Sequence, residues 1–133
     1  MDKMEIYVGF EDWLNNLFEN DILPENITAF HFNLYEESIE EHIYSVQIIA
    51  ADRFDEADGD WPCYEIWSSD EDIFCVDSSD EDDTGTERAL EFISKLVLKY
   101  LKTGKFRNII LSSTAVGIGF VDGDIKILYK TSQ

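Results

Sequence analysis

A period of two governs the stretch Thr28-Ala-Phe-His-Phe-Asn-Leu-Tyr35. Its phenylalanines and its leucine share one face of a β-strand, whereas His31, Asn33 and Tyr35 share the other. A second alternating stretch covers about 43–52, and a polar link joins the two. We therefore expect a β-hairpin with one apolar face at the centre of the fold.

Helical spacing of apolar residues predicts two helices around these strands. The first covers about 10–20 and ends ahead of Pro24, because the residue before a proline disfavours the helical conformation. The second opens at Thr84, where Glu87 completes a capping box, and stops at Gly104. Two short apolar stretches, 63–67 and 73–76, are expected to be strands between the helices.

The stretch Val116-Gly-Ile-Gly-Phe-Val-Asp-Gly-Asp124 predicts a closing hairpin. Asp122-Gly123 is typical of a two-residue turn with positive φ, and this turn sets the register. The register pairs Phe120 with Ile125, Ile118 with Ile127, and Val116 with Tyr129. Gly117 and Gly119 fall on the other face, where they indicate close approach by a helix or a bulky side chain.

The element order is therefore α-β-β-β-β-α-β-β. It predicts a single α+β domain over residues 1–133, with an antiparallel sheet of about six strands and two helices packed on one face.

Composition restricts the function. The 133 residues are 44% hydrophobic and carry a formal net charge of −19, which disfavours nucleic acid or an anionic membrane as a partner. Residues 1–87 hold 26 acids and two bases, a net of −24, and residues 88–133 hold three acids and eight bases, a net of +5. With two cysteines and no apolar leader near the start, the expected location is cytoplasmic.

No motif for catalysis or metal binding stands out, so we expect no enzyme activity, no cofactor and no metal. Calcium binding is an alternative, because Asp80 to Glu91 partly matches a twelve-residue calcium loop. Cys63 and Cys75 could face each other in a disulfide, but burial as small apolar side chains is the favoured interpretation.

An acidic and aromatic segment at 52–72 is the candidate interface. Aromatic anchors inside a charged rim are typical of protein-binding hot spots. The candidate partner-binding residues are Asp55, Asp58, Asp60, Trp61, Tyr64, Trp67, Asp70, Glu71 and Asp72. The alternative is that Trp61 and Trp67 cover the edge of the core while the acids keep the protein soluble. A second candidate edge consists of Glu36, Glu37, Glu40 and Glu41, beside Tyr35 and Tyr44.

The small acidic domain, the Asp55-Glu-Ala-Asp-Gly-Asp-Trp61 turn and the closing glycine-rich hairpin together resemble bacterial immunity proteins of polymorphic toxin systems. The resemblance implies a cytosolic protein that binds a basic toxin domain, such as a nuclease, and blocks it. Opposite charges would speed the encounter. A soluble adaptor or structural interaction domain without a toxin partner is the alternative from another class.

Overall fold

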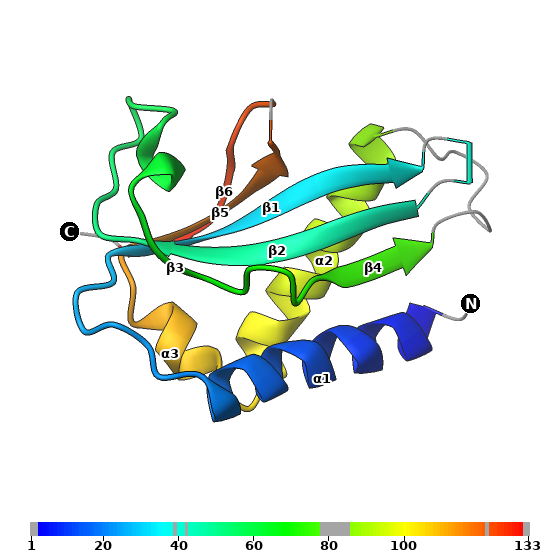
Figure 1. Cartoon of the computed structure of the whole chain (residues 1–133), viewed down its shortest axis with the longest axis horizontal. Helices are drawn as coiled ribbons and strands as arrows, with labels where there is room; N and C mark the ends of the chain where they lie inside the picture. Colours follow the sequence, from blue (N-terminus) through cyan, green and yellow to red (C-terminus); the bar gives the residue numbers. More distant parts are fainter. Residues whose placement is uncertain (1–2, 39, 42, 78–85, 122, 132–133) are drawn as a thin grey trace.

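The structure is a computed structural model and describes residues 3–38, 40–41, 43–77, 86–121 and 123–131. Its elements, in chain order, are α1 (Lys3–Asn20), β1 (Ala29–Ser38), β2 (Ile43–Ala51), the 3₁₀ turn η1 (Trp61–Cys63), β3 (Glu65–Ser68), β4 (Phe74–Asp77), α2 (Thr86–Thr103), α3 (Arg107–Leu111), β5 (Ala115–Phe120) and β6 (Lys126–Lys130). The helices lie on one side of a six-stranded sheet (Figure 1), so the predicted α+β class is confirmed.

The sheet runs in the order β3-β2-β1-β5-β6, and β4 also pairs with β2. All pairs are antiparallel except β1 with β5, which is parallel. The prediction of a fully antiparallel sheet is wrong at this pair. The chain crosses through α2 and α3 after β4 and re-enters beside β1, and such a long helical crossover is what a parallel neighbour requires.

The main core fills the space between the sheet and the helices. Phe30, Phe32 and Leu34 of β1 point into it, as the period of two predicted. Apolar stripes of α1 and α2 cover them, so both helices form because packing stabilises their amphipathic faces. α2 ends at the predicted place, where the amide of Gly104 donates to the carbonyl of Tyr100 over 2.7 Å.

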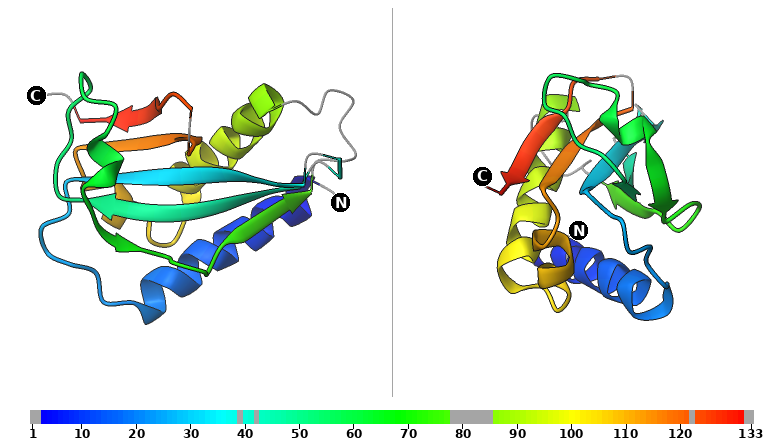
Figure 2. Two further views of the ribbon diagram at one scale, coloured as in Figure 1. Left: turned by 45° about the horizontal axis from the view of Figure 1, so that its top comes forward. Right: turned by 90° about the vertical axis from the view of Figure 1, so that its left-hand side faces the viewer.

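The opposite face of the sheet is covered at one end by the loop from residue 52 to residue 64, which we call the strap (Figures 1 and 2). The strap contributes Trp61 and Phe54 to a second, smaller core with Ala29, Ile49 and Ala115. The rest of this face carries the polar side of β1 and β2.

The closing hairpin differs from its predicted geometry. Val116 pairs with Tyr129 as expected, but a bulge then pairs Gly117 with Ile127 and Ile118 with Lys126. Residues 121–125 connect the strands, and no described glycine has positive φ, so the prediction for Gly123 is wrong. Asp122 lies outside the described residues. The extra residue of the bulge places Ile125 and Ile127 against the second core, whereas the two-residue turn would have put them with Ile118.

Candidate functional site

Trp61, one of the predicted binding anchors in the strap, is only 2% exposed. Its ring packs edge-on against Phe54, with 5.2 Å between centroids, and against His31, with 5.5 Å. A side chain this buried presents no surface to a partner. The prediction that Trp61 anchors binding is therefore wrong, and the alternative of a residue that covers the core holds for it.

Two aspartates of the strap accept hydrogen bonds from backbone amides within its turns. The carboxylate of Asp55 accepts from the amide of Ala57 over 2.9 Å, and that of Asp58 accepts from the amide of Asp60 over 3.0 Å. These are the local side-chain turns for which Asp and Asn are favoured. Asp55 and Asp60 remain exposed, and Tyr64 is 41% exposed beneath the guanidinium of Arg53, 4.1 Å from its ring centroid.

The other half of the predicted interface lies along the sheet edge that β3 forms. Trp67 is partly buried, stacks on Phe18 and donates from Nε1 to the carboxylate of Asp21 over 3.2 Å. Asp70 sits in the turn after β3 with a φ of 52°, held by hydrogen bonds to Ser68.

Exposed acids continue along this edge, because Glu71 and Asp72 also lie on the surface. The carbonyl of Asp72 accepts from Trp13 Nε1 over 3.0 Å, which ties the turn to α1. The structure thus separates the nine predicted residues into a strap group and an edge group.

A hollow of about 670 Å³ opens at the β3 edge and joins the end of α1 to that edge. We call it the edge hollow. It is lined by Asn20, Asp21, Ile22, Glu65, Ile66, Trp67, Ser68 and Asp70. Ile22 is 97% exposed and lies beside the carboxylates of this hollow.

Sequence reasoning missed the part that α1 contributes to this hollow. Asp21 and Ile22 lie more than 40 positions before β3 in the chain. The only local signal was that both follow the last predicted helical residues and precede Pro24, which marks a loop but does not place it beside β3.

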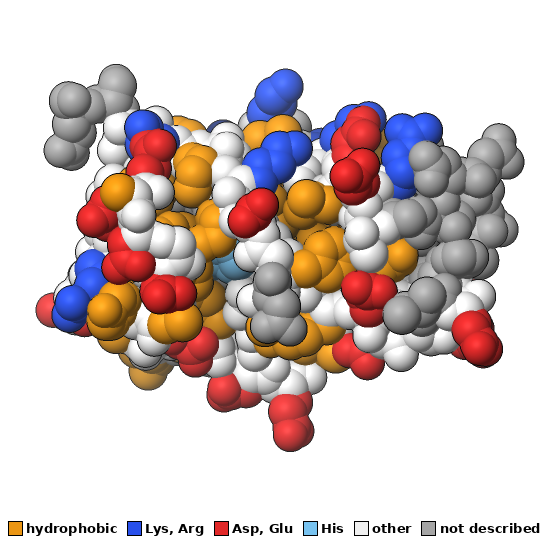
Figure 3. Space-filling model, turned by 90° about the horizontal axis from the view of Figure 1, so that it is seen from above, with side chains coloured by type: hydrophobic (Ala, Val, Ile, Leu, Met, Phe, Trp, Pro, Cys, Tyr) orange, Lys and Arg blue, Asp and Glu red, His pale blue; other side chains and the backbone are white. Residues whose placement is uncertain are grey.

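The edge hollow is electrostatically uncompensated. Asp21, Glu65 and Asp70 form no ion pair with a lysine or arginine among the described residues. Burial raises the pKa of Glu65, and the neighbouring Asp70 carboxylate raises it further. Figure 3 shows the wider pattern: carboxylates lie over the strap and along the lower border, while lysines and arginines gather along the upper border.

A chain of hydrogen bonds crosses the uncovered sheet face. His31 Nδ1 lies 2.8 Å from Asn33 Oδ1, and Asn33 Nδ2 donates to Gln47 Oε1 over 3.1 Å. The hydroxyl of Tyr35 donates to the same Gln47 oxygen, and Gln47 Nε2 donates to the carbonyl of Asp70. This polar row leads from beneath the strap to the β3 edge.

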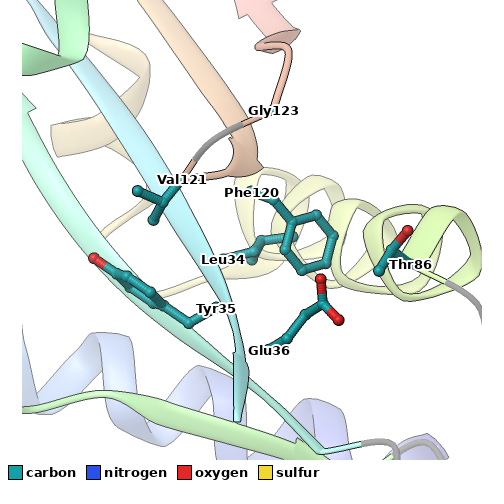
Figure 4. A pocket seen from close by; sticks show the side chains of 7 residues that line it. All are labelled: Leu34, Tyr35, Glu36, Thr86, Phe120, Val121 and Gly123. Carbon is teal, nitrogen blue, oxygen red and sulfur yellow. The ribbon is translucent and has the colours of Figure 1, made fainter. Parts of the chain in front are cut away.

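The second acidic edge borders another hollow, of about 430 Å³. Leu34, Tyr35 and Glu36 of β1 line it together with Thr86, Phe120, Val121 and Gly123 (Figure 4). Glu36 directs its carboxylate toward the side that holds Phe120 and Thr86, whereas Tyr35 points away. The second edge therefore joins a carboxylate to a partly apolar surface at the opposite end of β1.

The described residues hold neither a metal-binding cluster nor a disulfide. In the described part of the chain, no cluster of three or more His, Cys, Asp or Glu side chains could hold a metal ion. The segment that begins the calcium match, 80–85, lies outside the described residues. Cys63 and Cys75 are both free and exposed, so the prediction that they are buried is wrong. Among the described helices, none is long and apolar enough to cross a membrane.

Comparison with protein-family models, with curated proteins and with solved structures finds no match to this chain.

Proposed function

We propose that this protein is a small acidic interaction protein of the immunity type, which binds and blocks a basic toxin domain such as a nuclease. The observation that carries the proposal is the edge hollow, where carboxylates that form no ion pair with a described lysine or arginine lie around Trp67 and the exposed Ile22. A basic side chain from a partner would replace water there with opposite charge, and Ile22 would gain an apolar contact.

The charge of the molecule also supports a basic partner. Ion pairs between described residues engage the carboxylates of Glu19, Asp52, Glu56 and Glu91, and the chain as a whole carries a formal net charge of −19. The remaining negative field would raise the association rate with a basic protein and would compete with a nucleic acid for its binding groove. The strap's exposed Asp60 and Tyr64 would lie at the rim of such an interface.

The test is co-expression with the product of the adjacent gene, followed by co-purification and association kinetics. The charge variant combines Asp21→Asn, Glu65→Gln and Asp70→Asn. Asn fits the positive φ of position 70 and keeps an acceptor for Trp67 at position 21. We expect association at low salt to slow at least tenfold, with the difference shrinking as salt rises. Ile22→Ser should instead speed dissociation.

A matched control removes three exposed carboxylates outside both acidic edges, through Glu5→Gln, Asp12→Asn and Glu87→Gln. It changes the net charge by the same three units, so it separates docking at the hollow from general attraction. If the control slows association as much as the charge variant, the edge hollow is not the docking site. If the basic product of the adjacent gene does not bind the wild-type protein, the toxin-inhibitor proposal fails.

A further inference from the structure

The polar row fixes where His31 can take up a proton. Gln47 donates its amide hydrogen to the carbonyl of Asp70, so its oxygen accepts from Asn33 and Tyr35. The Asn33 amide thus points its nitrogen at Gln47 and its oxygen at His31. His31 Nδ1 must then carry the hydrogen, which leaves Nε2 as the basic nitrogen.

Among the described residues no group forms a hydrogen bond with His31 Nε2, and His31 is only 3% exposed. The ring packs against Trp61 of the strap, and its Cδ2 lies against the backbone of Gly117. Figure 3 shows histidine atoms at the bottom of a depression on this face. A proton on Nε2 would therefore create a charged donor without an acceptor in a dry site, which is costly unless water is admitted.

Among the described residues that pack against His31, none carries a charge that could balance a proton on the ring. Its neighbours are Asn33 on β1, Ile49 opposite it on β2, Gly117 on β5, Ile125 before β6 and Trp61 on the strap, all uncharged. The charged side chains next to these neighbours in the chain, Asp60, Asp124 and Lys126, are exposed. Relief for a protonated ring must therefore come from solvent.

The strap is the element that can admit that solvent. Trp61 is held in place by packing in the small second core, whereas His31 lies on β1, which pairs with a strand on each side. The strap is otherwise tied to the sheet by few polar contacts, including the ion pair of Glu56 with Lys130. Moving Trp61 exposes Nε2 without breaking a strand pair.

We propose that the strap is an acid-operated latch: proton uptake at His31 Nε2 releases Trp61 and lifts residues 52–64 from the sheet. At neutral pH the strap is closed over the second core. In acid it opens and exposes the apolar surface formed by Ala29, Ile49, Ala51 and Ala115. This property belongs to the free protein and does not depend on the proposed partner.

Burial lowers the pKa of His31 to about 4, and the hydrogen bond that Nδ1 donates to Asn33 acts in the opposite direction. If the ring regains its ordinary pKa of about 6.5 once the strap opens, linkage multiplies the opening equilibrium constant by about 60 between pH 7 and pH 4.5. Acid therefore favours opening of the strap, because the open state binds one more proton than the closed state.

The test uses the full chain labelled with 5-fluorotryptophan and followed by fluorine NMR. The protein has three tryptophans, and Trp13 and Trp67 pack on the helix side of the sheet, so they report on the main core. On acidification to pH 4.5 we expect the Trp61 resonance alone to move toward that of solvated fluorotryptophan. Over the same range the protection of the Trp61 indole N–H from hydrogen exchange should fall about 60-fold.

His31→Phe keeps an aromatic ring against Trp61 and cannot titrate, so its Trp61 signal and protection should not respond to acid. His31→Gln serves as a second variant that cannot titrate, in case the phenylalanine variant does not fold. The latch is refuted if all three resonances move together, which is global unfolding. It is refuted equally if Trp61 protection is unchanged at pH 4.5, or if a non-titrating variant opens like the wild type.

Discussion

Substitution of Gly117 by alanine tests the packing between the strap and the sheet. A Cβ at this position would lie 2.9 Å from His31 Cδ2, 3.0 Å from Trp61 Cζ2 and 3.1 Å from Ile125 Cγ2. Carbon atoms in ordinary contact are about 3.5–4.0 Å apart, so three side chains would have to withdraw by roughly half an ångström each. Overpacking of this kind costs about 1–3 kcal/mol.

Part of that cost is offset, because alanine reduces the entropy of the unfolded chain by about 0.4–1 kcal/mol relative to glycine. We therefore expect Gly117→Ala to lower the free energy of unfolding by about 1–2 kcal/mol. Gly59→Ala is the matched control, because its Cβ would meet nothing within 4 Å and its φ is not positive. That variant should be neutral or more stable by up to about 1 kcal/mol.

The assay is urea unfolding followed by far-ultraviolet circular dichroism, which does not depend on tryptophan fluorescence. With a slope of about 1–3 kcal/mol per molar urea, the Gly117→Ala midpoint should fall by roughly 0.5–1 M. A double-mutant cycle with Trp61→Phe should show coupling, because the smaller ring leaves room for the new methyl group. Equal stabilities of the Gly117 and Gly59 variants, within 0.5 kcal/mol, would refute the described packing.

Three other outcomes follow from the same structure. In the unfolded chain His31 takes up a proton below about pH 6.5, whereas with the strap closed it resists protonation down to about pH 4. Relative to His31→Phe, wild-type stability should therefore fall between pH 7 and pH 4.5, by at most about 2.5 kcal/mol and by less where the strap opens and the folded protein takes up the same proton. Urea unfolding at pH 7, 5.5 and 4.5 measures the difference. With a net charge of −19, the free protein should melt at a higher temperature as salt rises from 50 to about 500 mM, because screening weakens self-repulsion; a melting temperature that falls would contradict this. Both Cys63 and Cys75 should react with a thiol reagent under native conditions, and a mass shift for one label only would contradict their exposure.

Local patterns predicted the elements well because each pattern reflects packing on one face. The alternation around Phe32 identified β1 and its apolar side, and the stop at Gly104 placed the end of α2. The predicted close approach of a bulky side chain is confirmed at Gly117, which faces His31 and Trp61, whereas the close neighbour of Gly119 is the backbone of Asp124. In each case the residues that give the pattern are close together in the chain or lie on one face of an element.

Strand order and the fate of Trp61 could not be predicted in the same way. Whether β5 joins the sheet beside β1 or beside β4 is decided by which edges meet after α2 and α3 pack, and no local residue encodes that choice. A tryptophan among acids fits either an exposed anchor or a buried cover. The burial of Trp61 depends on residues of β1, β2 and β5, such as His31, Ile49 and Gly117, which lie more than ten positions away in the chain.

The acids of 52–72 separate into two kinds once the fold is known. Asp55 and Asp58 accept from backbone amides in turns, and Asp70 adopts a left-handed conformation, yet asparagine performs each of these tasks as well as aspartate. The fold therefore needs the shape of these side chains but not their charge. That charge carries a cost, which the raised pKa of Glu65 beside Asp70 registers. Solubility alone would be served by carboxylates spread over any surface. The carboxylates of Asp21, Glu65 and Asp70 instead line one hollow with Trp67 and the exposed Ile22 and form no ion pair with a described lysine or arginine, which is what a basic partner would explain.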